Sequence, residues 1–168
     1  MARDEDQNET RTARLDRLDL AILGHLQSDA RITNTELARR VDLSPPGLQK
    51  RLSKLREAGV IRGEVALIDR EQLGLDLLCF VQVTLSHHQP RTVQGFREAI
   101  REMPEVLECH LATGEFDYLL KVVATNHRTL EHFLVERLTP TVGVDKIRTT
   151  IVLNEIKHTT QLPLPEAE

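Results

Sequence analysis

Within residues 44–58, apolar positions recur with the period of an α-helix. Leu48, Leu52 and Leu55 stand at i, i+4 and i+7, so they share one face, which the pattern predicts to be buried. Ser44 is placed to cap this helix, and the two prolines after it fit a first turn, whose N–H groups have no intrahelical acceptor in any case. The sequence therefore predicts a capped amphipathic helix that begins just after Ser44.

A second helix is expected directly before it. Thr33 and Glu36 fit a capping box, in which each side chain accepts a hydrogen bond from an N–H group at the start of the helix. Residues 41–43 are short enough to be the turn between the two helices. A further helix is expected after its cap Asp16, with an apolar face made of Leu18, Ile22, Leu23 and Leu26. With Gly59 as a left-handed stop, the pattern predicts a three-helix unit that contains a helix-turn-helix.

Beyond residue 60 the pattern changes. Residues 60–68 are extended and predict a wing strand that also leads to a second domain. The later elements are expected as a strand at 77–85, a helix at 92–103, strands at 106–112 and 118–124 joined by a turn at 114–117, a helix at 130–138 and a strand at 144–155. The order β-α-β-β-α-β predicts a ferredoxin-like antiparallel sheet with two helices on one face. The fold class is therefore α+β, with an N-terminal (winged) helix-turn-helix.

These patterns divide the chain into five parts. We expect a disordered N-terminal arm at 1–14, the helix-turn-helix domain at 15–62, a linker with the wing strand at 63–76, the ferredoxin-like domain at 77–158 and a C-terminal tail at 159–168. Two helices cover only one side of such a sheet, and Phe80, Val106 and Val123 are expected near the other side. An uncovered apolar sheet face usually marks an interface, so we expect the chain to self-associate.

Charge is distributed unevenly along the chain. The sequence has 22 Lys and Arg against 26 Asp and Glu, yet residues 31–63 hold eight basic and only three acidic side chains. Lys50 and Lys54 point away from the leucine face of their helix, and Arg51 lies at its flank. A charged helix face is most often only a solvated one. Together with two capped helices and a tight turn, however, the local excess of positive charge predicts contact with DNA phosphates.

The composition narrows the remaining possibilities. Trp is absent and aromatic residues make up 3% of the 168, so the cores are expected to be aliphatic. The first twelve residues lack the apolar segment of a signal peptide, and no apolar run is long enough to cross a membrane, which predicts a cytoplasmic protein. Cys79 and Cys109 fall in segments that we expect to be buried strands, without CxxC spacing, so both are expected to be free buried thiols.

No pattern indicates catalysis or a bound metal. Neighbours such as His87 and His88 point to opposite faces of a strand and cannot easily chelate one ion, and the same holds for Cys109 and His110. The ligand spacings of common metal sites are missing. The sequence also lacks a Gly-rich phosphate loop and a nucleophile elbow. We therefore expect no enzymatic activity, no metal and no cofactor.

The segment Gly114-Glu115-Phe116-Asp117 admits two interpretations. A glycine followed by polar residues between two apolar strands is what a hairpin turn requires. The same loop also suits an amino-acid ligand, because Asp117 can accept hydrogen bonds from an ammonium group and free N–H groups of the turn can bind a carboxylate. The residues alone leave both interpretations open.

Several segments, in their order and spacing, resemble the Lrp/AsnC family of transcription regulators. In the first domain these segments are Leu15-Asp16-Arg17-Leu18-Asp19, Ile22-Leu23, Asp29-Ala30-Arg31-Ile32-Thr33, Glu36-Leu37-Ala38-Arg39-Arg40-Val41, Leu43-Ser44-Pro45, Arg51-Leu52-Ser53-Lys54-Leu55 and Gly59-Val60-Ile61. In the second domain they are Glu108-Cys109-His110 and Thr113-Gly114-Glu115-Phe116-Asp117-Tyr118. The resemblance extends from about Leu15 to Lys157, nearly the whole chain.

The resemblance implies a helix-turn-helix joined to a ferredoxin-like domain that binds an amino acid or a related small molecule. It further implies homodimers formed through the sheet, octamers built from them, and control of genes of amino-acid metabolism. By matching positions, the residues facing double-stranded DNA would be Ser44, Pro46, Gly47, Lys50, Arg51 and Lys54. Gln49 is added because it lies near the helix end expected to enter the groove. The effector-binding residues would be Gly114, Asp117, Tyr118, Thr150 and Ile151.

Three places depart from the family pattern. Gly47 stands where a bulkier side chain is common, residues 139–143 differ from the usual Leu-Pro-Gly, and Thr150 replaces a tyrosine of leucine-responsive members. Neither the operator nor the effector therefore carries over from the resemblance. Two alternatives are a sirohaem-decarboxylase-like tetrapyrrole enzyme of the same architecture, which would use histidines such as His110, and a DNA-binding regulator without an effector. The basic helix favours a DNA-binding regulator over the enzyme.

Overall fold

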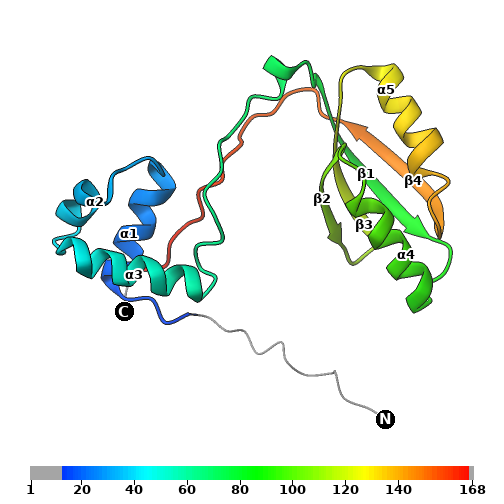
Figure 1. Cartoon of the computed structure of the whole chain (residues 1–168). Helices are drawn as coiled ribbons and strands as arrows, with labels where there is room; N and C mark the ends of the chain where they lie inside the picture. Colours follow the sequence, from blue (N-terminus) through cyan, green and yellow to red (C-terminus); the bar gives the residue numbers. More distant parts are fainter. Residues whose placement is uncertain (1–12, 167–168) are drawn as a thin grey trace, which may run out of the picture. The chain divides into compact units, whose positions relative to one another are not determined.

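The chain forms two units, each described here by itself. The computed structural model describes residues 13–166, so most of the predicted arm at residues 1–14 lies outside the described residues. One unit ends at Ala66 and takes in the C-terminal segment from His158, and the other runs from Leu67 to Lys157 (Figure 1). Among the described residues, no helix is long and apolar enough to cross a membrane.

The first unit is built from three helices, α1 (Arg17–Ser28), α2 (Asn34–Arg40) and α3 (Pro45–Glu57). Each begins at the predicted cap: Asp16, Thr33 and Ser44 accept hydrogen bonds from the backbone N–H groups of Asp19, Glu36 and Gly47. These caps satisfy N–H groups that have no acceptor within the helix. The apolar faces then meet in one aliphatic core, which contains Ile22, Leu23, Leu37, Ala38, Val41, Leu48, Leu52 and Leu55.

The turn between α2 and α3 depends on a left-handed residue. Asp42 has φ of 53°, a conformation that aspartate tolerates better than most side chains. The N–H of Leu43 then donates to the carbonyl of Ala38 at 2.9 Å, which closes the end of α2. Gly59 has φ of 71° after α3, as predicted for a left-handed stop. The helix-turn-helix prediction is thus confirmed in its helices, its turn and its end.

The C-terminal segment completes this helical unit. Leu164 packs against its core, with its Cδ1 3.6 Å from the place that a Cβ on Gly24 of α1 would take. The side-chain amide of Gln27 donates to the carbonyl of Leu162 at 3.1 Å and accepts from the N–H of Leu162 at 2.6 Å. Gln161 donates to the carbonyl of Gln27 at 3.2 Å. The segment predicted as a C-terminal tail is therefore bound to α1.

The wing strand was not a correct prediction. Residues 62–69 are extended but pair with no strand in the described part of the chain, and their apolar side chains remain in solvent, with Val65 82% and Leu67 68% exposed. Apolar residues with a strand-like composition form a strand only when a partner strand satisfies their backbone groups. The segment is a linker, which leads through a short 3-10 helix η1 (Glu71–Leu73) to the sheet.

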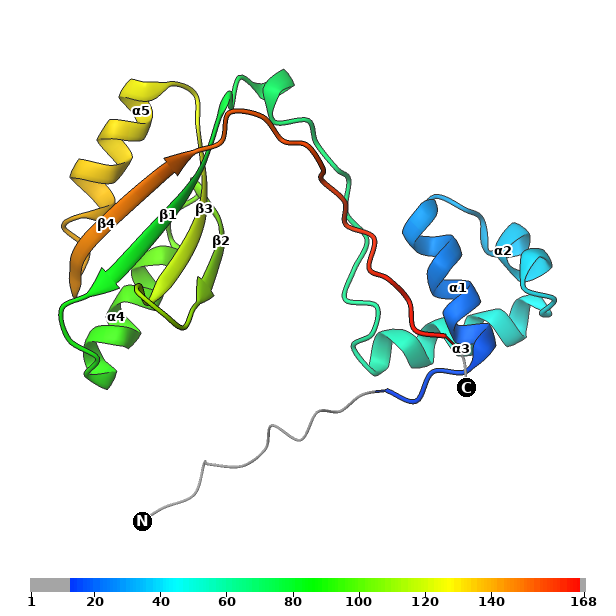
Figure 2. The same cartoon turned by 180° about the vertical axis from the view of Figure 1, so that it is seen from behind.

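The second unit is an antiparallel sheet of four strands in the order β2-β3-β1-β4 (Figure 2). Its strands are β1 (Leu77–Leu85), β2 (Val106–Leu111), β3 (Tyr118–Ala124) and β4 (Val144–Ile151), so β4 ends four residues earlier than predicted. Helix α4 (Pro90–Arg101) follows β1, and α5 (His127–His132) continues as a π-helical segment η2 (Phe133–Leu138). The ferredoxin-like βαββαβ prediction is confirmed.

The two helices and one face of the sheet enclose the second core. Alternate residues of the central strands, such as Val81, Val83, Leu120 and Val122, contact Phe96 and other apolar side chains of α4, α5 and η2. The intervening residues of β1 (Leu78, Phe80, Gln82 and Thr84) therefore face away from the helices, on what we call the open face. This face is more polar than predicted, because Lys146 and Arg148 of β4 pair with Thr84 and Gln82 of β1.

Two residues lie elsewhere than predicted. Val106 pairs with the core residue Val122 and packs against the helix-side core, because a bulge between Val106 and Glu108 changes the register of β2. Cys109 is exposed rather than buried, since β2 is an edge strand, whereas Cys79 is a buried thiol in the centre of the sheet. Burial raises the pKa of the Cys79 thiol, which keeps it protonated and unreactive.

Candidate DNA-binding helix and effector pocket

Helix α3 presents a polar surface opposite its leucine face. Gln49, Lys50 and Lys54 are exposed, and neither lysine belongs to any ion pair in the described part of the chain. Ser53 is exposed on the same side, three residues after Lys50 and four after Gln49. Ser53 therefore shares the exposed face of the predicted DNA-binding residues, as its spacing from Gln49 and Lys50 in the sequence indicates. Two unpaired ammonium groups on one helical face suit contact with phosphates.

The start of α3 is tightly packed around Gly47. The Ser44 hydroxyl accepts a hydrogen bond from the N–H of Gly47 at 3.3 Å. A Cβ on Gly47 would lie 3.1 Å from the same hydroxyl oxygen, closer than most real contacts. The glycine therefore accommodates the cap in this chain. Ser44 and Pro46 are exposed beside it, so this end of the helix is open to a ligand such as a phosphate.

Arg51 differs from the lysines, although all three were predicted to face DNA. Its Nη1 donates to a carboxylate oxygen of Asp16 at 2.6 Å and of Asp19 at 2.8 Å. The N–H of Asp19, followed by the Arg51 guanidinium, lowers the pKa of the Asp16 carboxyl. Asp19 itself is 3% exposed. The structure thus places Arg51 in a charged cluster between α3 and the start of α1.

Helix α2 has only half of the predicted capping box. Thr33 accepts from the N–H of Glu36, but the Glu36 carboxylate turns to Arg39 and Arg40, with contacts of 2.8 Å to each guanidinium. These charge-assisted hydrogen bonds outcompete the reciprocal cap, because both arginines lie one helical turn away. Hydrogen bonds from Arg39 and then Arg40 lower the pKa of Glu36 to about 2.

In the second unit, the loop between β2 and β3 uses Asp117 to hold its own conformation. One carboxylate oxygen of Asp117 accepts from the N–H of Leu85 at 2.7 Å, and the other lies 2.6 Å from Nε2 of His88. The Leu85 N–H is the main cause of the lowered pKa of Asp117. Gly114 has φ of 122°, which favours glycine. The geometry supports the hairpin interpretation for both residues.

Tyr118 lies on the helix side of the sheet. Its side chain is buried, with 3% exposed, and its ring centroid is 4.7 Å from that of Phe96. Its hydroxyl accepts a hydrogen bond from Nε of Arg97 at 3.1 Å. A ring packed in this core cannot touch a ligand bound on the open face.

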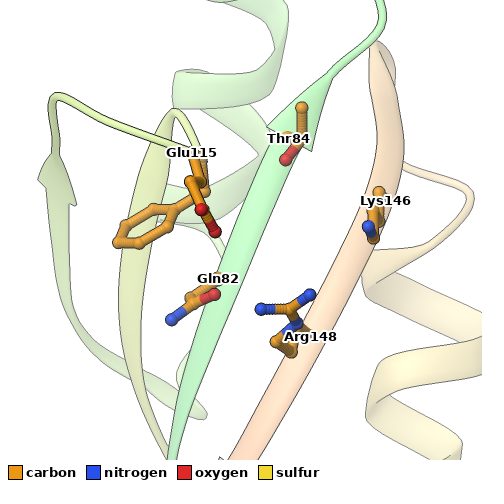
Figure 3. A pocket seen from close by; sticks show the side chains of 6 residues that line it. Gln82, Thr84, Glu115, Lys146 and Arg148 are labelled. Carbon is orange, nitrogen blue, oxygen red and sulfur yellow. The ribbon is translucent and has the colours of Figure 1, made fainter.

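A pocket lies on the open face, beside this loop. It is lined by Gln82, Thr84, Glu115, Phe116, Lys146 and Arg148. Figure 3 shows that these side chains come from β1, from β4 and from the loop after β2, and that they gather on one side of the sheet. Lys146, Arg148 and Glu115 take part in none of the ion pairs found within residues 13–166. The pocket therefore holds two cations and one carboxylate available for a ligand.

The remaining predicted effector residues lie further along β4. Thr150 pairs with Phe80 on the open face, two residues beyond Arg148, and is exposed. Ile151 pairs with Cys79 and is 38% exposed. Neither lines the pocket. Gln82, Thr84, Lys146 and Arg148 were missed because they lie on two strands far apart in the sequence, and only the register of β1 with β4 brings them together.

Among the described residues, no group of three or more His, Cys, Asp or Glu side chains is arranged to hold a metal ion. His110 lies 3.1 Å from the Glu108 carboxylate, which Lys121 also contacts at 3.1 Å. His110 is thus part of a small charged cluster on β2 and β3.

The chain matches two family models in sequence order. Residues 15–62 match the model described as winged helix-turn-helix DNA-binding, and residues 78–162 match the Lrp/AsnC ligand binding domain. The second match covers half of the chain and includes all of the sheet except Leu77. The chain belongs to the Lrp/AsnC family. It is a DNA-binding transcriptional regulator rather than an enzyme, so the decarboxylase alternative is not favoured.

Known Lrp/AsnC proteins resemble the chain along most of its length. The leucine-responsive regulatory protein of Rhizobium meliloti is 41% identical over 150 residues, 89% of this chain and 96% of that protein. The protein of the same name from Escherichia coli is 40% identical over 148 residues, 88% and 90% of the two chains. A transcriptional regulator from Neisseria meningitidis, solved in complex with L-Met, is 40% identical with a TM-score of 0.84, covering 89% and 96%. AsnC of Escherichia coli is 28% identical with a TM-score of 0.79, covering 89% and 99%.

Proposed function

We propose that this regulator binds an amino acid in the pocket on the open face, and that binding changes its affinity for the DNA of amino-acid metabolism genes. The observation that carries the proposal is the arrangement of unpaired charges in the pocket. Arg148 and Lys146 suit the carboxylate of an amino acid, with the guanidinium able to make two parallel hydrogen bonds. Glu115 suits the ammonium group. The names of the relatives, leucine-responsive proteins and a regulator in complex with L-Met, support an amino acid as the ligand class.

Glu115 of the pocket, rather than Asp117, is the proposed partner of the ammonium group. Both oxygens of Asp117 already have partners in Leu85 and His88, so a ligand would have to displace one of them. Glu115 has no ion-pair partner among residues 13–166, and it lies two residues earlier on the same loop. Gly114 contributes by allowing the turn that brings Glu115 over the sheet.

A thermal-shift screen of the twenty amino acids tests this proposal. A ligand that binds only the folded protein raises its apparent stability by mass action. We expect a shift with one amino acid or a few similar ones, lost in Arg148→Gln and in Glu115→Gln. The matched control is Arg128→Gln, which removes an exposed arginine of α5 outside the pocket and should leave the shift intact. No shift with any amino acid would favour a regulator without such an effector.

We further propose that the functional unit is a homodimer formed through the part of the open face around Phe80, which does not line the pocket, and that dimers assemble into octamers. Phe80 supports this interface, because it is 37% exposed in the middle of β1. A dimer would place two copies of α3 in major grooves about one helical turn apart, or a multiple of it. Sedimentation of the full chain should give a dimer or a multiple of it, and Phe80→Asp should reduce it to smaller species.

A further inference from the structure

Asp16, Asp19 and Arg51 form a cluster, here called the charged clamp, between α3, the second helix of the helix-turn-helix, and the start of α1. Asp16 and Asp19 form a reciprocal capping box: the N–H of Asp19 donates to Asp16 at 2.9 Å, and the N–H of Asp16 donates to Asp19 at 3.2 Å. Each carboxylate uses one oxygen for this cap. The other oxygen of each accepts from Nη1 of Arg51, at 2.6 and 2.8 Å. All four carboxylate oxygens therefore have a partner, and a single arginine of α3 completes the cap of α1.

Burial makes this clamp important for the position of α3. Asp19 is the one charged residue among the buried side chains of the described chain, with 3% exposed. A buried carboxylate is unfavourable unless a cation and hydrogen bonds compensate it. The leucine face of α3 resists separation from the core, but apolar contacts are not directional. The hydrogen bonds from Arg51 are directional, so they fix the rotation and the sliding of α3 along α1.

The contrast with the two lysines of α3 supports a separate role. Lys50 and Lys54 are exposed and have no ion-pair partner among the described residues, whereas the Arg51 side chain is 28% exposed and bridges two carboxylates. Both N–H groups of Nη1 can be used by the two aspartates, so a phosphate would be left with Nε and Nη2 and would approach both negative charges. The two carboxylates would thus repel a DNA phosphate at this position, unlike a phosphate beside Lys50 or Lys54.

We propose that Arg51 is a positioning residue, which supports DNA binding by fixing α3 against Asp16 and Asp19 rather than by neutralising a phosphate. The lysines supply the salt-dependent attraction to DNA, and the clamp determines the angle at which they reach it. Asp19 is on this view as necessary for DNA binding as Arg51, although it carries a negative charge. Positioning and phosphate contact by Arg51 therefore predict opposite changes in DNA affinity when the Asp19 charge is removed.

The test uses the full chain and a duplex selected in vitro from a random-sequence pool for binding to the wild-type protein. Fluorescence anisotropy gives the affinity across a range of salt concentrations for Arg51→Gln, Asp19→Asn and the matched control Lys54→Gln. Each phosphate contact that is lost reduces the slope of log affinity against log salt by about 0.9. We expect this reduction for Lys54→Gln. For Arg51→Gln we expect an affinity loss on the order of tenfold, the scale of coupling between contacting residues, with an unchanged slope.

Asp19→Asn should also weaken DNA binding. If Arg51 instead contacts phosphate, removal of a nearby carboxylate frees the arginine and reduces repulsion, so affinity should rise. A rise in affinity, or a slope for Arg51→Gln that falls as in Lys54→Gln, would overturn the proposal.

The double variant Asp19→Asn/Arg51→Gln distinguishes the loss of the clamp from a loss of folding. Arg51→Gln alone leaves the buried Asp19 charge uncompensated, whereas the double variant has no such charge. Because both changes break the same clamp, the double variant should lose about as much affinity as the weaker-binding single variant. Losses that add, or a double variant with wild-type affinity and specificity, would show that Arg51 and Asp19 do not act together.

Discussion

Helix α3 and the loop before β3 both carry charged side chains, but they differ in how many of these are available to bind a ligand. On α3, Lys50 and Lys54 extend into solvent, whereas Arg51 is held by Asp16 and Asp19 and Arg56 pairs with Glu64 at 3.1 Å. In the loop, Asp117 is held by Leu85 and His88, and Glu115 is the charged side chain that lines the pocket. Each region thus combines a charged side chain that is held by partners within the protein with others that are available to a ligand. The comparison teaches that charge alone does not identify a binding residue. Whether a charged side chain can bind a ligand also depends on the partners that it already has within the protein.

The largest effect should come from removing the free charges of α3. We expect Lys50→Ala/Lys54→Ala to weaken DNA binding roughly 10- to 100-fold near 0.1 M salt and to reduce the salt slope by about 1.8, two phosphate contacts. The melting temperature should hardly change, since both side chains are exposed. Anisotropy titrations at several salt concentrations measure the slope. A slope equal to that of the wild type would exclude these lysines from the DNA interface.

The hydrogen bonds of Asp117 in the loop should contribute to stability rather than to ligand binding. Asp117→Ala leaves the partly buried N–H of Leu85 without its acceptor, which costs about 1–3 kcal/mol of unfolding free energy. Asp117→Asn is the matched control, because its side-chain oxygen can still accept from Leu85 and it loses only the pair with His88. Denaturant titration should find the alanine variant clearly less stable than the asparagine variant. Equal stability of the two would mean that the Leu85 hydrogen bond contributes little.

Acid should weaken the same interactions of Asp117. The pKa of Asp117 is lowered in the folded protein, so the carboxylate stabilises the fold fully above its ordinary pKa of 3.8, and this contribution is lost as pH falls through the lowered value. The stability difference between the wild type and Asp117→Asn should therefore shrink on acidification below about pH 4. Melting curves from pH 3 to pH 7 measure it. A difference that grows in acid would contradict the depressed pKa.

The C-terminal segment should have a smaller effect, confined to the helical unit. Leu164 is only partly buried against the core of that unit, so Leu164→Ala should cost roughly 1 kcal/mol, below the range for fully buried leucines. Hydrogen exchange should report the loss in α1 and leave the strands protected. The exposed Leu153, 98% exposed, provides the control, since Leu153→Ala should change nothing. Loss of protection in the sheet instead would argue against docking of this segment on α1.

The smallest effect belongs to the exposed arginine pairs of α2. The pKa of Glu36 is lowered to about 2, so its interaction with Arg39 and Arg40 persists above pH 4.5 and disappears only as pH falls towards 2. Because all three groups are on the surface, salt screens the interaction and Glu36→Gln should barely change the melting temperature. A large drop in melting temperature at neutral pH would show that this cluster contributes more than an exposed pair.

Much of the fold follows from local patterns, and the candidate DNA-binding face follows from the same source. The leucines at 48, 52 and 55 fix which side of α3 is buried, and helix geometry then places Lys50 and Lys54 opposite. Caps at Asp16, Thr33 and Ser44 depend only on residues within the same helix. Helix periodicity also assigned Arg51 to the flank. It carries no information about Asp16 and Asp19, which are 35 and 32 residues away in sequence.

The effector pocket depends on contacts that the sequence does not encode locally. Gln82 and Arg148 meet because β1 and β4 pair in one particular register, 66 positions apart. The bulge in β2 that turns Val106 towards the helices has a similarly distant cause, its pairing with β3. The prediction of a wing strand was wrong because it used local composition alone. Residues 62–69 have strand-like composition but no partner strand among the described residues.

The central claim is that an amino acid bound in the pocket alters DNA binding by α3. The most direct test measures the affinity of the full chain for an in-vitro-selected duplex with and without each amino acid, in the wild type and in Arg148→Gln. The account predicts that at least one amino acid changes the wild-type affinity and that Arg148→Gln binds the duplex but no longer responds. A duplex affinity that is the same with all twenty amino acids, or a full response in Arg148→Gln, would contradict it.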